Sequence, residues 1–518
     1  MYYLNKLFLF IILLIKLFQK MFLNYLFIII FNVITSLKNE KLVFAELHFR
    51  HGARAPNVLD ANGTGIDILG IKWPSPGELT PIGKRMEYLL GLRNRQRYII
   101  EENLISEVFD PHEIRVFSSD QNRTLQSAVS HIQGFYPVFL HNGEKLEPEQ
   151  CDKAVPPLNI SNVTEIEEQK DFLNDSALPY YMNIIPIHVV HYRNSTYNCS
   201  LKLRDIFMNN LNTSTSLKNI VEEFNNKYFE QLKDIFPLKV FNNTLNFSFI
   251  IGFCDAYIAD YAEGKDLSNF LEISKMSEAD IYDLCDRANT INFRDIYYQD
   301  VKNESILFHN SLVMRDMINY MKGRVDDDIQ LDISKKNLSD FSKPKLVILT
   351  GHDTTLSGQE AYFIRFFGLD IDSYYYPYFG SQITYEITRE DVDDDMRGKL
   401  TYSDYTVKYY FNDDLLLNVS FDEFVKKVEK NIWSLEDIDK FCYGENYTSN
   451  TIIKNETNSD NKNNNSIDTN LFIIMIMGII IFILVIVIVF LTVKLMHKNK
   501  DTKDDQLIKD ERIINEDD

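Results

Sequence analysis

The sequence predicts an α/β fold with an inserted, mostly helical region and one carboxyl-terminal transmembrane helix. Short apolar runs at residues 42–49, 114–117 and 346–349 are each followed by a helix-like pattern, as is typical of strands in an open α/β sheet. Residues 136–335, between the second and third runs, are irregular and mostly helical. Residues 471–493 are uncharged and almost wholly apolar, and they exceed the ~20 residues that a helix needs to cross a bilayer.

Residues 1–36 have the pattern of a segment that directs a protein into the secretory pathway. Reading from Met21 as a second start, an apolar core ends in the small or hydroxyl residues Thr35 and Ser36, which is typical of a cleaved signal peptide. An uncleaved anchor formed by the first apolar run is the alternative. We favour cleavage, and whether residues 1–20 are translated stays open.

Residues 49–56 (FRHGARAP), at the end of the first apolar run, place a histidine between two arginines. The guanidiniums of Arg50 and Arg54 offer planar sets of donors that can bind phosphoryl oxygens in pairs. His51 between them can act as a nucleophile toward the bound phosphorus. Gly52 removes a side chain where the backbone must turn and an anion must approach. The spacing therefore predicts a phosphate site with His51 as its nucleophile.

Two further polar segments follow the other apolar runs. Residues 118–128 (SSDQNRTLQSA) contain Arg123, and residues 350–355 (TGHDTT) contain His352 and Asp353. The carboxyl ends of strands in an open α/β sheet form the crevice that binds ligands, and helix amino termini there favour anions. Three segments that are distant in sequence are therefore expected to converge on one phosphate.

These motifs make the chain resemble the histidine acid phosphatases, branch two of the histidine phosphatase superfamily. The family signature is Arg-His-Gly-x-Arg-x-Pro near the mature amino terminus with a His-Asp pair far downstream. A middle family motif, whose arginine contacts the phosphate, resembles residues 118–128. The resemblance spans roughly residues 41–443, with the motifs in order. It implies a three-layer, phosphoglycerate-mutase-like domain formed by residues 37–135 and 336–445, and a helical cap at residues 136–335 that shapes the substrate entrance.

Local patterns predict individual elements within these parts. Thr80 and the proline that follows it are typical of an N-cap and a first helical turn. One face of that helix, which we expect in the core, carries Ile82, Met86 and Leu89 or Leu90. Further helices are expected at residues 201–208, 220–232, 279–288 and 311–321, and strands at residues 383–387 and 406–411.

The resemblance implies an acid phosphatase that hydrolyses phosphate monoesters in two displacements. His51 would attack the phosphorus and form a phosphohistidine, while protonated Asp353 gives its proton to the leaving oxygen and later acts as a base toward water. The phosphoryl oxygens would be held by Arg50, Arg54, Arg123 and His352. Since the ordinary pKa of aspartate is about 4, an acidic working pH is expected. We expect no metal and no other cofactor, and the sequence carries no zinc-type Cys/His spacing and no P-loop.

The carboxyl-terminal segments predict where the chemistry takes place. Residues 446–470 are dense in Asn and Ser and read as a solvated stalk in front of the transmembrane helix at residues 471–493. Lysines cluster in residues 494–518, so the positive-inside tendency places this tail in the cytosol. We therefore expect a single-pass type I membrane protein, with its catalytic part in a lysosome-like lumen or at the cell surface.

All five cysteines lie in the predicted lumenal part, which favours disulfides with one thiol left over. The family resemblance implies a bond between Cys151 and Cys442. Cys199 is then expected to pair with Cys254 or with Cys285. Glycosylation of a secretory protein is also expected, at sequons that include Asn194, Asn212, Asn246, Asn303 and Asn418.

The formal net charge of −21 argues against nucleic-acid binding, because the chain would repel a polyphosphate backbone. The expected partners are a small phosphate monoester and the membrane, and a homodimer stays open. A phytase-like or inositol-polyphosphate phosphatase of the same family is an alternative, although the cap offers no obvious basic cluster. A catalytically silent receptor for phosphorylated ligands is a second alternative. A phosphotransfer mutase is disfavoured by the predicted membrane anchor.

Overall fold

The computed structural model describes the chain between residues 40 and 444, with internal gaps. The described residues are 40–57, 65–138, 145–151, 154, 172–182, 184–190, 197–236, 240–241, 244–330, 343–392, 396 and 398–444. The predicted signal region, stalk, transmembrane helix and cytoplasmic tail all lie outside these ranges. No helix within the described ranges is long and apolar enough to cross a membrane. Residues up to Ser434 form one compact unit, and a second unit begins at Leu435 with helix α15 (Leu435–Tyr443).

A seven-stranded mixed sheet lies at the centre of the first unit, in the strand order β3-β2-β6-β1-β7-β8-β9. Four of its strands are parallel: β3 (Ile187–Val189), β2 (Ile114–Ser118), β6 (Leu346–Gly351) and β1 (Glu40–Arg50). Three are antiparallel: β7 (Gln382–Glu390), β8 (Tyr405–Phe411) and β9 (Asp414–Ser420). The strands predicted at residues 383–387 and 406–411 are confirmed as β7 and β8.

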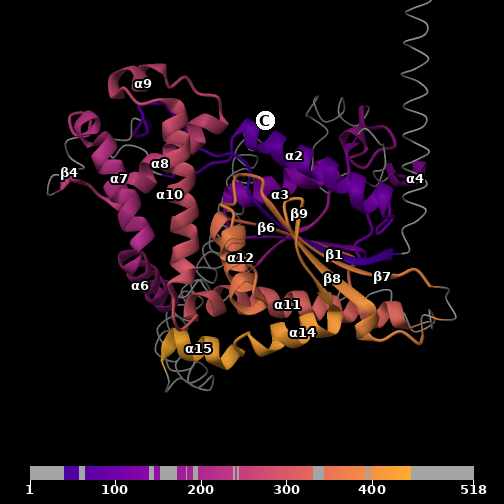
Figure 1. Cartoon of the computed structure of the whole chain (residues 1–518). Coiled ribbons are helices and arrows are strands. Elements are labelled where there is room, and N and C mark those ends of the chain that lie inside the picture. Colours follow the sequence, from indigo (N-terminus) through magenta and orange to yellow (C-terminus); the bar gives the residue numbers. More distant parts are fainter. Residues whose placement is uncertain are drawn as a thin grey trace, which may run out of the picture. The chain divides into compact units, whose positions relative to one another are not determined.

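Helices cover both faces of the sheet and give three layers (Figure 1). One face carries α2 (Pro81–Arg95) and α3 (Asn122–Phe135); the other carries α11 (Glu304–Ile329), α12 (Asp353–Phe367) and α14 (Phe421–Lys430). Alternate residues of β1 enter the two cores that this arrangement creates. Leu47 and Phe49 pack in the core that α3 closes, whereas Phe44 packs in the core that α11 and α12 close. The predicted α/β class is therefore confirmed.

Helix α2 begins as predicted but buries a different face. Thr80 is its N-cap, and its hydroxyl accepts a hydrogen bond from the backbone N–H of Gly83. The predicted core face is wrong at Ile82, which is 41% exposed, and at Leu89, which is 55% exposed. Met86 is half-buried, and Leu90 packs against the core that contains Leu47 and Phe49. The buried face instead carries Gly83, Glu87, Gly91, Asn94 and Arg95.

The absence of a side chain explains why α2 turns its glycine face inward. A Cβ on Gly91 would lie 2.9 Å from the carbonyl carbon of His131 in α3, and a Cβ on Gly134 would lie 2.9 Å from the backbone nitrogen of Leu92. The two helix backbones therefore approach more closely than any larger residue allows. This close packing determines the buried face, whereas apolar spacing alone had suggested a neighbouring one.

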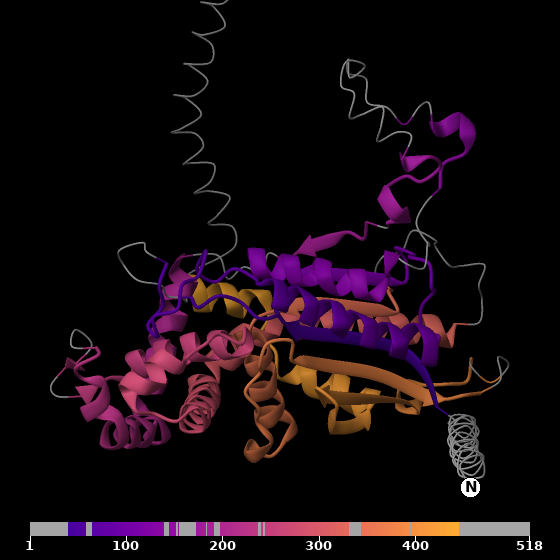
Figure 2. The same cartoon turned by 90° about the horizontal axis from the view of Figure 1, so that it is seen from above.

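A helical cap follows β3 and ends before α11 (Figure 2). Its helices are α6 (Tyr197–Thr213), α7 (Thr215–Leu232), α8 (Phe247–Ala262), α9 (Ser268–Ser274) and α10 (Glu278–Tyr298). Apolar side chains of α7, α8 and α10 share one core with α9. Helix α8 had not been predicted, because its sequence FSFIIGFCDAYIADYA is apolar on nearly all sides and shows little helical periodicity.

The predicted cysteine pairs are wrong. Cys254 of α8 is bonded to Cys285 of α10, so neither can pair with Cys199. Cys199 and Cys442 are each disulfide-bonded, whereas Cys151 is a free thiol. The thiol of Cys151 instead makes local contacts with the carbonyl oxygens of Glu147 and Asn174, at 3.6 and 3.7 Å. The predicted Cys151–Cys442 bond therefore does not form.

Candidate active site

The predicted site residues meet where β1, β2 and β6 end. Arg50 and His51 follow β1, Arg123 lies in the first turn of α3 after β2, and His352 and Asp353 follow β6. The ladder continues past the strands, because the backbone N–H of His51 donates to the carbonyl of Gly351 at 3.1 Å. Helices α3 and α12 lie on opposite faces of the sheet (Figure 1). Ligands of open α/β sheets bind where strands end between two such helices.

The ring of His51 is oriented by its own backbone neighbour. Its Nδ1 donates to the carbonyl oxygen of Gly52 at 2.9 Å, which leaves the lone pair on Nε2. The residue is 1% exposed. Burial, together with the positive charges of Arg50 and Arg54, lowers the pKa of His51 well below its ordinary value of 6.5. His51 is therefore a neutral imidazole with an unprotonated Nε2.

Close backbone contacts hold this loop in place. A Cβ on Gly52 would lie 2.8 Å from the Cα of Gly83, so the loop rests directly on the first turn of α2. The N–H of Gly52 donates to the hydroxyl of Ser127 in α3 at 3.1 Å. Both helices of one face thereby fix the position of His51.

The three arginines lie around the histidine in different pairings. Arg50 forms an ion pair with Asp353 at 2.7 Å, and Arg54 forms one with Asp255 of the cap helix α8, also at 2.7 Å. Arg123 has no carboxylate within salt-bridge distance among the described residues. Its Nη2 lies 3.4 Å from Nδ1 of His352. In the same part of the chain, the buried Nε atoms of all three arginines lack a hydrogen-bond partner. The cluster thus combines three positive charges with two carboxylates and keeps donors available for an anion.

His352 closes the cluster on the side of β6. Its ring centre lies 5.5 Å from that of His51. Arg123 can only donate, so Nδ1 of His352 is the acceptor and the ring proton is on Nε2. Nε2 therefore donates to the hydroxyl of Ser119 at 2.9 Å. Burial and the charge of Arg123 lower the pKa of His352 to about 4. A neutral His352 can therefore donate through Nε2 at mildly acidic pH.

Asp353 is the N1 residue of α12 and is ionised in this arrangement. Burial favours its neutral form, but the charges of Arg50 and Arg54 outweigh burial and lower the pKa of Asp353 below its ordinary value of 3.8. One oxygen also accepts from the N–H of Thr354 at 2.8 Å. Asp353 therefore needs a further negative charge nearby before it can carry the proton that we predicted for it.

An aromatic wall, formed by the loop before β7, borders the cluster. The ring of Phe379 lies 4.4 Å from the guanidinium carbon of Arg50, 5.7 Å from that of Arg54 and 5.8 Å from the ring centre of His51. The hydroxyl of Tyr376 accepts a hydrogen bond from Arg50 at 3.1 Å. The ring of Phe379 thus stabilises the positive charges of Arg50 and Arg54 by cation–π contacts.

Comparison with known proteins identifies the family. A family model described as "Histidine phosphatase superfamily (branch 2)" matches residues 67–412. The chain belongs to this superfamily. The predicted resemblance is confirmed, and the matched range begins after the motif at residues 49–56, so the match does not depend on that motif.

Similar proteins include named acid phosphatases. Lysosomal acid phosphatase of Xenopus laevis is 33% identical over 161 residues, which are 31% of this chain and 34% of that relative. Prostatic acid phosphatase of Bos taurus is 22% identical over 320 residues, which are 62% of this chain and 68% of that relative. Among solved structures, a phytase of Klebsiella sp. ASR1 covers 76% of this chain and 96% of its own, with a TM-score of 0.48 and 14% identity.

The structure brings all six predicted site residues together, and it adds three that carried no motif. Asp255 lies in the cap, and Tyr376 and Phe379 lie in the loop before β7. The sequence shows these two segments only as an apolar run and an aromatic stretch. The aromatic run YYYPYF at residues 374–379 is the one signal that could have indicated a wall next to a ligand. The roles of the predicted residues remain predictions.

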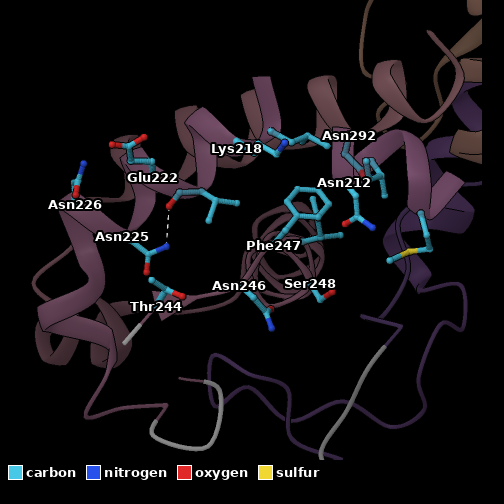
Figure 3. A pocket seen from close by; sticks show the side chains of 15 residues that line it. Asn212, Lys218, Glu222, Asn225, Asn226, Thr244, Asn246, Phe247, Ser248 and Asn292 are labelled. Carbon is cyan, nitrogen blue, oxygen red and sulfur yellow. Dashed lines mark hydrogen bonds between the residues drawn. The ribbon is translucent and has the colours of Figure 1, made fainter. Parts of the chain in front are cut away.

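A separate groove of about 890 Å³ lies within the cap. Figure 3 shows the amides of Asn212, Asn225, Asn246 and Asn292 around it, with the ring of Phe247. Among the described residues that line it, Lys218 is the only basic one, and the six predicted site residues are not included. This groove is therefore not the phosphate site.

Proposed function

We propose that the protein is an acid phosphatase that hydrolyses phosphate monoesters through a phosphohistidine on His51. The observation that carries this proposal is the state of that ring: it is neutral, its Nδ1 donates to Gly52 so that Nε2 keeps the lone pair, and the charges of Arg50 and Arg54 act on it. Burial and the charges of Arg50 and Arg54 lower the pKa of His51, so an acidic medium protonates this ring less readily than a free imidazole.

The first displacement uses this lone pair. The Nε2 lone pair forms the N–P bond, the ester P–O bond breaks, and its electrons leave with the alkoxide or phenoxide oxygen. Asp353 gives that oxygen its proton. The guanidiniums of Arg50, Arg54 and Arg123 stabilise the negative charge on the three remaining oxygens.

Binding of the substrate places beside Asp353 the negative charge that its protonation requires. A phosphoryl group brings negative charge beside the carboxylate and competes for the donors of Arg50, which now hold Asp353 at 2.7 Å. Both effects raise the pKa of Asp353 from its lowered value. Protonation of Asp353 is thus coupled to substrate binding and is favoured by an acidic medium.

In the second displacement, water replaces the imidazole. The water oxygen attacks the phosphorus, Asp353 takes a proton from it, and the electrons of the N–P bond return to Nε2 of His51. Inorganic phosphate then leaves. Each step uses only side chains of this chain.

We propose a type I membrane setting for this activity, anchored by residues 471–493 with the catalytic part in a lumen or outside the cell. The uncharged apolar stretch and the lysines that follow it support this orientation. The name of the Xenopus laevis relative, lysosomal acid phosphatase, agrees with an acidic compartment.

Hydrolysis of an aryl phosphate by the full-length protein at pH ~5, with a chelator present, tests the proposal. We expect turnover in the wild type, a loss of about a thousandfold or more in His51→Ala, and a loss of at least about a hundredfold in Asp353→Asn. His188→Ala, which changes a half-buried histidine of β3 outside the cluster, is the matched control and should keep its activity. Equal activity in His51→Ala and the wild type would refute the proposed nucleophile.

A further inference from the structure

One carboxylate of the cap lies inside the phosphate-binding cluster. The Asp255 side chain, on α8, is 23% exposed and accepts a hydrogen bond from Arg54 at 2.7 Å. It also accepts from the backbone N–H of Asn57 at 2.8 Å and lies 3.4 Å from the Asn57 side-chain nitrogen. A phosphoryl group bound to Arg54 would share that guanidinium with Asp255. The carboxylate therefore stands next to the position of the substrate.

Other cap residues that reach the loops around the cluster are also acidic. Glu263, at the C-cap of α8, accepts a hydrogen bond from Thr80, and Asp286 of α10 accepts one from Tyr378. Helix α8 contains no lysine and no arginine. On the side of α3, Glu78 accepts a hydrogen bond at 3.0 Å from the side-chain amide of Asn122, the residue before Arg123. Glu263 and Asp286 bond to hydroxyls outside the cluster, so Asp255 is the carboxylate of the described cap residues that contacts a cluster arginine.

We propose that Asp255 makes the site selective for monoesters whose leaving group carries no further negative charge, such as aryl phosphates, and disfavours polyphosphorylated substrates. This inference rests on the proposed phosphatase function. A substrate with several phosphates must bring at least one more of them toward the cap, where it meets Asp255 at close range. A neutral ring can instead pack against Phe379, whose ring centre lies 5.8 Å from that of His51.

The test compares two substrates in three variants of the full-length protein. Asp255→Asn removes the charge and keeps an acceptor for Arg54, and Asp255→Ser covers the case in which the asparagine variant folds poorly. Glu263→Gln removes one cap charge outside the cluster and is the matched control. We expect the ratio of kcat/KM for inositol hexakisphosphate to kcat/KM for an aryl phosphate to rise about tenfold in both Asp255 variants and to stay constant in Glu263→Gln.

A change of the same factor for both substrates would overturn the inference, because Asp255 would then only position Arg54. A wild type that prefers inositol hexakisphosphate would also overturn it. Calorimetric binding in the His51→Ala background separates this inference from the proposed function, since binding needs no turnover. If the affinity ratio shifts with Asp255→Asn while the wild type hydrolyses nothing, the selectivity stands and the phosphatase proposal fails; an unshifted affinity ratio refutes the selectivity.

Discussion

Asp260→Asn should make the stability of the protein less dependent on pH. Asp260 of α8 is fully buried. Its carboxylate and that of Asp67 both accept from the indole N–H of Trp73. Trp73 Nε1 lies 2.9 Å from Asp67 and 3.1 Å from Asp260. Asp67 also accepts from the backbone N–H groups of Leu69 and Ile71, whereas one buried oxygen of Asp260 has no hydrogen-bond partner among the described residues. Asp260 is therefore the member of the pair that holds a proton.

The size and sign of the effect follow from the pKa of this group. Burial, and then the neighbouring charge of Asp67, raise the pKa of Asp260 from 3.8 to about 8. Between pH ~4 and ~8, Asp260 holds a proton in the folded state that it has released in the unfolded chain. Its contribution to stability therefore falls as pH rises through this window and is constant outside it. At 1.36 kcal/mol per pKa unit the upper limit is about 6 kcal/mol.

Thermal unfolding of the full-length protein from pH ~4 to ~8.5 measures this effect. The difference in Tm between Asp260→Asn and the wild type should be near zero at the acidic end and should reach its largest positive value above pH ~8. Asp205→Asn, which changes a carboxylate that is 74% exposed, is the control and should show a small difference that does not vary with pH. Glu87 and Glu360 are buried with raised pKa values and add slope of the same sign in every variant. A pH-independent difference for Asp260→Asn would refute the reasoning.

Three further substitutions test other parts of the structure. Arg123→Lys keeps the charge but loses the paired donors, so KM for an aryl phosphate should rise about tenfold; an unchanged KM would exclude Arg123 from binding. Phe379→Ala removes the ring 4.4 Å from Arg50 and about 1 kcal/mol of cation–π stabilisation, so kcat/KM should fall roughly fivefold, and a variant with wild-type kinetics would contradict this role. Cys254→Ser opens the bond to Cys285, which spans a separation of 31 residues, and should lower the free energy of unfolding by about 3 kcal/mol. Equal stability of Cys254→Ser and the wild type in denaturant would contradict that value.

The strands and the convergence of the site could be predicted because both depend on local signals. The apolar runs before Arg50, Arg123 and His352 became β1, β2 and β6, and parallel strands bring their carboxyl ends to one edge of a sheet. The N-cap at Thr80 was predictable for the same reason, since its hydroxyl bonds a backbone N–H only three residues away.

What the sequence could not predict depends on packing between distant segments. The inward face of α2 is set by Gly91 against α3, and a pattern of apolar residues contains no information about that close approach. Asp255 reaches Arg54 only because α8 packs beside the cluster, and α8 itself reads as an unpatterned apolar run. Cysteine spacing is equally uninformative, because the bond between Cys254 and Cys285 depends on how two cap helices lie side by side.

The most direct test of the central claim is to trap the covalent intermediate. The full-length protein is mixed with a radiolabelled aryl phosphate, quenched in alkali within the first turnover because phosphohistidine is unstable in acid, and digested for peptide mapping. We predict label on the peptide that contains His51 in the wild type and none in His51→Ala. Turnover without label on His51, or label on another residue, would contradict the account.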